Sequence, residues 1–542
     1  MGEETSDMTD TAYTPIPRLE RHGDDVLLMV DGAPFTMLAG EVHNSCSSSS
    51  RAFAQALDQA VSLGMNSVLT PVTWELVEPE EGHFDFSCVD SMLELARQRG
   101  LRLGLLWFGA WKNAQAFYAP GWVKRDLERF PRAQMVAGQN RVVLTDFHNM
   151  TYTALSLFGD ETRAADARAF AALMAHLAEV DTCRTVITVQ VENECGEQGA
   201  AREHSAAADA AFAQMVPADL VEALRASAET LAPDIAQALA VGTGEGTWEE
   251  VFGPVAEEIF TTYHMAGYVE AVARAGRDAY QLPLAVNCWL DKGHKPGRFP
   301  TGGPVARVME VWRHVAPSIE VICPDVYVPY FCQVCDEYRK LCNPLYVPET
   351  AVQAYAAPRE IWAVGHHHAV CFAPFGFEDM GTPFDASAGV LFGADTSDPM
   401  LRTPQEPEEY ACTTRAVAQL LELLPTPEER ATLDAVTSER PDENVIDLVD
   451  FRLTAHFPEG GMPGAVAAGR ARDGSIYVVS SHAMITFSST AEDLPHVDFI
   501  ALEDGSAQDG AWVRDRRLNG DEATVTSYDE PTLLRVELFA YA

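Results

Sequence analysis

The sequence predicts an α/β protein: a (β/α)8 TIM barrel followed by a C-terminal all-β domain. The first observation is a series of short runs of apolar and β-branched residues, typical of strands buried on both faces. Helix-length segments with apolar residues at helical spacing separate these runs, and such alternation produces a parallel sheet. After about residue 424, β-branched alternation and Asp-Gly or Asn-Gly turns replace this pattern.

Eight candidate strands follow one another, enough to close a parallel sheet into a barrel. A hairpin precedes the first, because Asp31-Gly32 separates two apolar runs. The strands are expected at residues 35–42, 67–72, 101–107, 186–191, 284–289, 319–327, 345–349 and 369–373. Apolar stripes predict helices around residues 53–61, 89–96, 170–177, 305–312 and 417–424.

The same patterns set the expected domain boundaries. We expect a flexible leader at 1–24 and the barrel at 25–424, with insertions at about 115–160 and 196–248. A segment rich in Pro, Glu, Asp and Thr predicts a linker at 425–446, before a β-sandwich domain at 447–542.

Composition excludes several classes of partner. The chain has 38 basic and 80 acidic residues, so its formal net charge is −42 and its pI is near 4.6. Nucleic acid and anionic membrane surfaces would repel such a protein. The N-terminus has no apolar signal segment, and no run of about 18 apolar residues occurs. Eleven cysteines, an odd number, favour free buried thiols in a reducing cytoplasm.

Two candidate strands end in carboxylates. The run at 186–191 leads into Glu192-Asn193-Glu194, and the run at 345–349 ends in Glu349. One such Glu-Asn-Glu alone is more commonly a solvated turn, but the carboxyl ends of parallel strands converge on one mouth. A retaining glycosidase needs a protonated acid and an ionised nucleophile there, with carboxyls roughly 5–5.5 Å apart. Residues 192 and 194 share a face in an ideal strand, so a bulge or twist at Asn193 is needed to separate their roles, and the role of Glu192 stays open.

Several segments are similar to one family. VQVENECG at 189–196 resembles the acid/base segment of glycoside hydrolase family 35 β-galactosidases, which are retaining (β/α)8 glycosidases. Four further segments resemble the bacterial branch with a C-terminal β-domain: LAGEVHNSCSSS at 38–49, LTPVTWELVEPEEGHFDF at 69–86, LLWFGAWKN at 105–113 and NPLYVPE at 343–349. The resemblance implies that Glu194 is the acid/base, that Glu349 is the nucleophile and that Asn193 bonds the sugar 2-hydroxyl. That branch commonly has basic residues after its nucleophile, whereas this chain has Thr350 to Gln353. Because this loop borders the sugar pocket, the difference bears on which sugar the protein accepts.

Further residues at or just past strand ends are candidates for binding a sugar. Tyr327 is the candidate donor to Glu349. Indole rings pack on sugar C–H faces, and four tryptophans have suitable positions, half of which we expect to be core residues instead: Trp74, Trp107, Trp111 and Trp289. The polar candidates for reading hydroxyls are Glu75, Lys112, Asn113, Asn287, and His43 or Asn44.

No metal or cofactor is predicted. Cys332-x-x-Cys335 lacks a second pair with ligand spacing. Glu41 with His43 could suggest a metal, as could the adjacent histidines His366, His367 and His368. Three adjacent histidines point in different directions on any regular element, so we expect them at the surface or behind the site.

The sequence therefore predicts an exo-acting retaining β-galactosidase that acts on small oligosaccharides or glycosides. The same mechanism on another sugar, such as a β-glucoside or an arabinopyranoside, stays open. So does a non-catalytic carbohydrate-binding barrel, and a metal-dependent hydrolase is a more distant alternative. The resemblance and the long insertions suggest self-association, with a homodimer as the simplest form.

Overall fold

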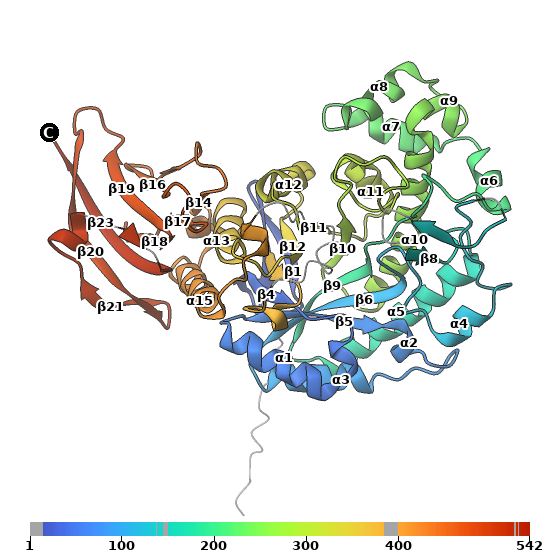
Figure 1. The fold of residues 1–542 in the computed structure, drawn as a ribbon, viewed down its shortest axis with the longest axis horizontal. Helices are drawn as coiled ribbons and strands as arrows, with labels where there is room; N and C mark the ends of the chain where they lie inside the picture. Colours follow the sequence, from blue (N-terminus) through green and yellow to red (C-terminus); the bar gives the residue numbers. More distant parts are fainter. Residues whose placement is uncertain (1–14, 137, 145–149, 384–398, 525–526, 529) are drawn as a thin grey trace, which may run out of the picture.

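The structure is a computed structural model, and it describes residues 15–136, 138–144, 150–383, 399–524, 527–528 and 530–542. Within these residues, eight parallel strands close into a barrel, and antiparallel sheets form a domain beside it (Figure 1). The predicted fold class, a (β/α)8 barrel with a C-terminal all-β domain, is confirmed.

The barrel strands follow one another in chain order. The ring closes where Cys371 of the last strand pairs with Met37 of the first. Each strand overlaps a run predicted from the sequence: β4 (Met37–Glu41), β5 (Ser67–Thr73), β6 (Arg102–Lys112), β9 (Val186–Asn193), β10 (Leu284–Trp289), β11 (Val321–Val326), β12 (Tyr346–Thr350) and β13 (Cys371–Pro374). Because all eight run parallel, their carboxyl ends meet at one mouth.

A small hairpin closes the opposite end. β1 (Arg18–His22), β2 (Asp25–Val30) and β3 (Ala33–Phe35) form an antiparallel sheet. Leu28 and Val30 of β2 pack into the apolar cluster that fills the barrel interior. The expectation of a flexible leader at 1–24 is therefore wrong for Arg18–His22, since β1 pairs along its whole length with β2. Residues 1–14 lie outside the described residues.

Helices surround the barrel and bury their apolar stripes against its outer face. They are α1 (Ser50–Ser62), α3 (Ser87–Arg97), α5 (Asp160–Val180), α10 (Ala256–Ala279), α11 (Met309–Val315), α12 (Phe331–Tyr338) and α13 (Ala356–His367). Two short helices, α2 (Trp74–Val77) and α4 (Gly121–Arg125), lie in loops at the mouth side. In the described part of the chain, every helix is too short or too polar to cross a lipid bilayer.

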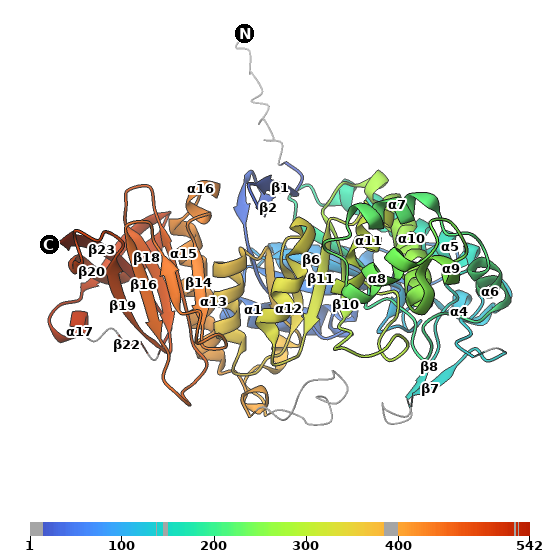
Figure 2. The same cartoon turned by 90° about the horizontal axis from the view of Figure 1, so that it is seen from above.

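Both predicted insertions carry structure of their own. The first contains α4 and a hairpin of β7 (Val142–Leu144) and β8 (Met150–Tyr152). Figure 2 shows β7 and β8 at the end of the barrel opposite β1 and β2. The second holds α6 (Ala206–Phe212), α7 (Ala218–Ala226) and α8 (Pro233–Val241), and α9 (Trp248–Phe252) begins at its end; these helices lie far from the C-terminal domain (Figure 1).

The C-terminal domain packs two sheets around an apolar core of its own. The larger sheet has the order β14-β17-β18-β23-β20-β21, and the smaller β15-β16-β19-β22. Their bounds are β14 (Asp434–Thr437), β15 (Val445–Asp447), β16 (Phe451–His456), β17 (Ala465–Arg470), β18 (Ile476–Ser481), β19 (Ala483–Ser489), β20 (His496–Gln508), β21 (Ala511–Arg517), β22 (Ser527–Tyr528) and β23 (Thr532–Tyr541). A short helix, α17 (Asp521–Thr524), follows β21.

The predicted linker at 425–446 is wrong. α16 (Pro427–Arg430) begins there with a capping box between Thr426 and Glu429, and β14 then pairs with β17. The Pro- and Glu-rich composition comes from this helix start, where both residue types are favoured. α15 (Pro407–Leu423) and α13 pack between the barrel and the larger sheet. The chain therefore passes from one domain to the other through packed helices and not through an extended linker.

Candidate active site

A cavity of about 370 Å³ opens at the carboxyl ends of the barrel strands. Aromatic, amide and charged side chains line it: His43, Asn44, Lys112, Asn113, Gln115, Phe117, Tyr118, Tyr152, Glu194, Trp289, Lys292, Asp325, Tyr327, Glu349 and Phe375. Ligand pockets span about 300–1,000 Å³, so this one lies near the small end of that range. Its size suits one sugar unit and part of a second group.

Glu194 and Glu349 meet in this cavity. Glu194 directly follows β9, and Glu349 lies in β12 on the far side of the barrel mouth. One carboxylate oxygen each of Glu194, Glu349 and Asp325 lies within 4.8 Å of the other two. A single anomeric carbon therefore fits between the two glutamates.

Glu194 is held from both sides. The Asn113 side-chain amide donates to its carboxyl group, and its backbone N–H donates to Asn287 Oδ1 at 2.9 Å. Burial raises the pKa of Glu194 to about 7, the nearby charge of Glu349 adds to this, and Lys112 opposes it. A carboxyl with this pKa keeps a large protonated fraction at neutral pH, as a general acid requires.

Glu349 is surrounded by donors. Tyr327 Oη donates to Glu349 Oε2 at 2.7 Å, and Asn193 Nδ2 points to Oε1 at 3.5 Å. Lys112 Nζ donates to Asn193 Oδ1 at 2.8 Å, which fixes the orientation of that amide. These bonds favour the negative charge that a nucleophilic carboxylate carries.

Lys112 supplies positive charge to a group of four carboxyls. Burial alone would lower its pKa, but the charges of Glu349, Glu194, Glu41 and Asp325 outweigh burial and raise it. An ammonium in this position offsets part of the repulsion among the carboxyl groups.

The raised pKa of Glu194 predicts a pH-dependent effect on stability. The folded state binds this proton more tightly than the unfolded state, so the stabilisation is complete below pH 4.5 and is lost as pH rises through about 7. Replacing Glu194 by Gln should therefore raise the free energy of unfolding at pH 8 by on the order of 3 kcal/mol. Thermal unfolding should show the gain at pH 8 and little difference near pH 4. A variant that melts below wild type at pH 8 contradicts the prediction.

The structure brings most of the predicted site residues together. His43, Asn44, Lys112, Asn113, Trp289 and Tyr327 line the cavity with the two glutamates. Asn193 and Asn287 lie fully buried behind its wall and contact Glu349 and Glu194 respectively.

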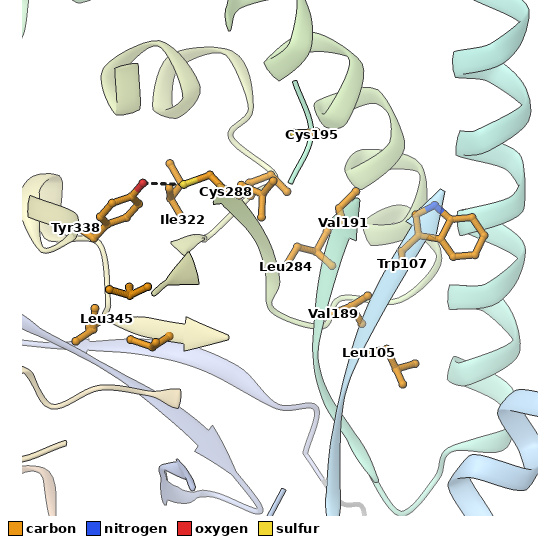
Figure 3. Packing of buried hydrophobic residues seen from close by; sticks show 14 of the residues in the cluster. Leu105, Trp107, Val189, Val191, Cys195, Leu284, Cys288, Ile322, Tyr338 and Leu345 are labelled. Atoms are coloured by element: carbon orange, nitrogen blue, oxygen red, sulfur yellow. Dashed lines mark hydrogen bonds between the residues drawn. The ribbon is translucent and has the colours of Figure 1, made fainter. Parts of the chain in front are cut away.

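Three predicted tryptophans do not line the cavity. Trp74 donates Nε1 to Glu78 at 2.9 Å, and Trp111 packs edge-on against Tyr268 of α10. Trp107 points to the helices outside the barrel and donates Nε1 to Asp166 of α5 at 2.9 Å (Figure 3). All three are fully buried core residues, whereas half of the four were expected to be, and of the four tryptophans Trp289 lines the cavity.

The prediction that Glu75 binds a sugar hydroxyl is also corrected. Its carboxylate pairs with Lys124 Nζ at 3.4 Å and does not line the cavity. It lies in the first turn of α2, where a negative charge is favourable, and this accounts for an acidic residue at the position.

Sequence reasoning missed several residues of the cavity. Asp325 lies in β11 beside Glu349, accepts from Asn287 Nδ2 at 2.8 Å, and has its pKa raised well above 3.8 by burial and then by Glu349. A carboxylate inside the buried run 319–327 was the available signal. Glu41, considered from the sequence only as part of a metal site, is fully buried at the end of β4, and neither carboxyl oxygen has a hydrogen-bond partner among the described residues.

Gln115, Lys292 and Phe375 were also missed, and the first insertion supplies three missed aromatic residues. Phe117 and Tyr118 come from the loop after β6, and Tyr152 comes from β8. Phe117 is 52% exposed although its ring borders the cavity. Long loops carry few local signals, so only the fold reveals which of their aromatic residues reach the mouth.

The three adjacent histidines form separate contacts away from the cavity. His366 Nδ1 bonds Asp434 at 2.8 Å, His367 Nε2 bonds Asp336 at 3.0 Å, and His368 Nδ1 bonds Asp25 at 2.7 Å. His366, His367 and Asp336 could offer three metal ligands, but Arg440 already pairs with Asp336. Glu194, Asp325 and Glu349 could likewise offer three oxygen ligands to a metal ion. At that place the ammonium group of Lys112 already supplies positive charge to the three carboxyls.

The fold and the site define the class of protein: a (β/α)8 barrel with two buried glutamates that face each other across the cavity at the carboxyl ends of the strands. Comparison with known proteins gives a family match over the first part of the barrel. The model of glycosyl hydrolases family 35 matches residues 27–116, which contain the first three barrel strands. This match confirms the resemblance for the segments at 38–49, 69–86 and 105–113, whereas the segments at 189–196 and 343–349 lie outside it. A domain of unknown function (DUF5597) matches residues 409–527, which cover most of α15 and much of the β domain.

Individual proteins show similarity as well. A β-galactosidase of Xanthomonas manihotis is 45% identical over 58 residues, which make up 10% of this chain and 9% of that protein. Among solved structures, β-galactosidase from the psychrophilic Marinomonas ef1 has a TM-score of 0.45 at 13% identity, with 71% of this chain and 60% of that chain covered. Exo-β-1,4-mannosidase Op5Man5 from Opitutaceae bacterium strain TAV5 has a TM-score of 0.40 at 15% identity, with 72% and 60% covered.

Proposed function

We propose that this protein is an exo-acting retaining β-galactosidase that removes terminal β-galactosyl units from oligosaccharides or glycosides. The observation that carries the proposal is the pair Glu194 and Glu349, with carboxylate oxygens within 4.8 Å in one small cavity. Retaining enzymes place the two carboxyls about 5–5.5 Å apart, whereas inverting enzymes leave about 6.5–9.5 Å for a water. The match to glycosyl hydrolases family 35 and the similar β-galactosidase segment support galactose as the sugar.

The proposed reaction has two steps. Glu349 attacks the anomeric carbon while Glu194 donates its proton to the departing glycosidic oxygen, which leaves a galactosyl ester on Glu349. Glu194, now a carboxylate, then removes a proton from water, and that water attacks the same carbon and releases Glu349. Asn193, held by Lys112 and directed to Glu349, is placed to bond the sugar 2-hydroxyl.

Hydrolysis of chromogenic glycosides tests the proposal. The purified chain should release nitrophenol from nitrophenyl β-galactoside faster than from the β-glucoside or the α-arabinopyranoside. Proton NMR should show the β-anomer of galactose as the first product. A preference for another sugar changes the substrate but keeps the mechanism, and α-galactose as first product contradicts retention. Sugar binding by calorimetry without any hydrolysis would favour a binding barrel.

Phe117 is expected to hold the group next to galactose. A half-exposed phenyl ring at the cavity border offers a stacking surface for a second sugar. Replacing Phe117 by Ala should lower kcat/KM on lactose by about 3- to 10-fold, from the about 0.5–1.5 kcal/mol of one aromatic contact. The same variant should leave methyl β-galactoside unaffected.

A matched control is available for this variant. Phe84 is 40% exposed and does not line the cavity, so replacing it by Ala should change neither substrate. Equal losses on lactose and methyl galactoside in the Phe117 variant would contradict a role in binding the second sugar.

A further inference from the structure

A second pair of carboxyls lies behind the catalytic strand, outside the barrel. Glu192 of β9 and Asp166 of α5 are both fully buried. In the described part of the chain, neither forms an ion pair with Lys or Arg. Two buried negative charges without a cation would cost several kcal/mol, so the pair must share a proton.

The hydrogen bonds indicate which carboxyl carries the proton. Asp166 accepts from Trp107 Nε1 at 2.9 Å and from Tyr268 Oη at 3.1 Å, and the backbone N–H of Ala110 lies close to both carboxyls. Glu192 Oε2 accepts from the backbone N–H of Trp111 at 2.8 Å, whereas Glu192 Oε1 has no such donor among the described residues. The proton therefore belongs on Glu192 Oε1, from which it can be donated to Asp166.

Packing leaves the pair no room to rearrange. A Cβ added to Gly109 would lie 2.6 Å from Asp166 Oδ1 and 2.7 Å from Glu192 Oε1, so only glycine fits there. Burial raises the pKa of Glu192 well above 4.5, and the Asp166 charge adds to this. The other titratable groups facing the pair are Tyr268 of α10 and the buried Cys195 thiol.

The backbone links this pair to the catalytic cavity. Glu192 has φ 61° and Glu194 has φ 44°, so left-handed residues stand on both sides of Asn193. The β6–β9 register also shifts here, between the pairs formed by Trp107 and Lys112. Non-glycine residues in this conformation cost about 1–3 kcal/mol each and persist only where surrounding contacts hold them. The turn sends Glu192 outward to α5 and Glu194 inward to the cavity.

We propose that Glu192 is a positioning residue: as a neutral carboxyl hydrogen-bonded to Asp166, it anchors the left-handed turn that carries Glu194 into the cavity. The inference rests on the proposed glycosidase function, because it assigns Glu192 an effect on acid catalysis. Glu192 touches neither substrate nor reacting atoms and acts through the backbone of residues 192–194.

Amide variants test where the proton lies. In Glu192→Gln, the side-chain NH2 can donate to Asp166 while the amide oxygen accepts from Trp111, so both contacts persist. We expect kcat within a few-fold of wild type. Asp166→Asn should be more damaging, because its NH2 would face the Trp107 or Tyr268 donor. Glu192→Ala should be the most damaging. The proposal is overturned if Glu192→Gln is as inactive as Glu192→Ala.

The leaving group separates positioning from loss of stability. A misplaced Glu194 harms methyl β-galactoside, which needs a proton on its leaving oxygen, far more than dinitrophenyl β-galactoside, which needs none. Measured as kcat/KM, which does not include the later hydrolysis of the galactosyl ester, the loss in Glu192→Ala should be about 10- to 100-fold greater on the methyl glycoside than on the dinitrophenyl one. As a control, Glu360→Gln changes a buried carboxyl bonded to Tyr410 and should leave this ratio unchanged. Equal losses on both substrates in Glu192→Ala would overturn the proposal.

The protonation of Glu192 can also be tested without a substrate, so that this test does not depend on the proposed function. The infrared difference spectrum between wild type and Glu192→Gln at pH 8 should contain the C=O stretch of a protonated carboxylic acid. A difference spectrum with only carboxylate bands would overturn the proposed proton position. If wild type hydrolyses no glycoside, the proposed function falls, while this spectrum still decides the state of Glu192.

Discussion

Replacing Glu349 by Gln is expected to lower kcat on nitrophenyl β-galactoside by on the order of 10⁴- to 10⁶-fold, as removal of a covalent nucleophile does elsewhere. The amide keeps the shape of the side chain and can still accept from Tyr327, which donates at 2.7 Å in the wild type. It cannot form the glycosyl ester, so the first step of double displacement stops. KM should change much less than kcat, because the hydroxyl contacts of the sugar remain.

Trapping the intermediate tests the same residue directly. A 2-deoxy-2-fluoro galactoside with a good leaving group should label the wild type, and mass spectrometry should place the adduct on Glu349. The Glu349→Gln variant should take up no label and should unfold at a temperature close to that of wild type. Undiminished turnover in this variant, or an adduct on Asp325, would refute Glu349 as the nucleophile.

The barrel could be predicted because its signals are local. Strands buried on both faces read as apolar runs, and all eight runs became strands of one ring. The two errors in domain organisation have a shared cause. Residues 18–22 form a polar edge strand, and residues 434–437 form a short edge strand inside a stretch rich in Pro, Glu, Asp and Thr. Composition therefore suggests loops at both places, but pairing with β2 or with β17 orders them.

The sequence could predict only those site residues that lie at the ends of strands. Glu194 and Glu349 follow apolar runs, so parallel topology brings them to one mouth. The tryptophans show the limit of that reasoning. Leu106 and Phe108 of β6 belong to the inner cluster, so alternation sends Trp107 and Trp111 outward, and counting along the strand could have shown this.

Other parts of the site had no local signal. Alternation would place Glu192 on the same face as Glu194, and the left-handed backbone at both residues overrides it. The bulge or twist expected at Asn193 takes the form of left-handed residues on both sides of it, together with a shift of the β6–β9 register. The contact between Glu192 and Asp166 joins β9 to α5, a tertiary relation that no spacing in the sequence records.

Replacing Glu194 by Gln is expected to lower kcat/KM on methyl β-galactoside by about 10²- to 10⁴-fold, the usual contribution of general acid–base catalysis. Wild-type activity on this substrate should fall above pH 7, tenfold per pH unit, because only the protonated acid can donate and its pKa is about 7. The alkaline decline should vanish in the variant, because Gln does not titrate. A variant with an unchanged pH profile would show that another group sets the decline.

Substrates with good leaving groups separate the two tasks of Glu194. Dinitrophenolate departs without a proton, so glycosylation of Glu349 should stay fast in Glu194→Gln and the galactosyl ester should accumulate. Hydrolysis of that ester needs a base, which the amide is not. Azide needs no base, so it should restore turnover and yield β-galactosyl azide. Asn113→Ala is the matched variant, since it removes the amide that contacts Glu194 but keeps the carboxyl. That variant should gain nothing from azide, and rescue of both would mean that position 194 does not supply the base.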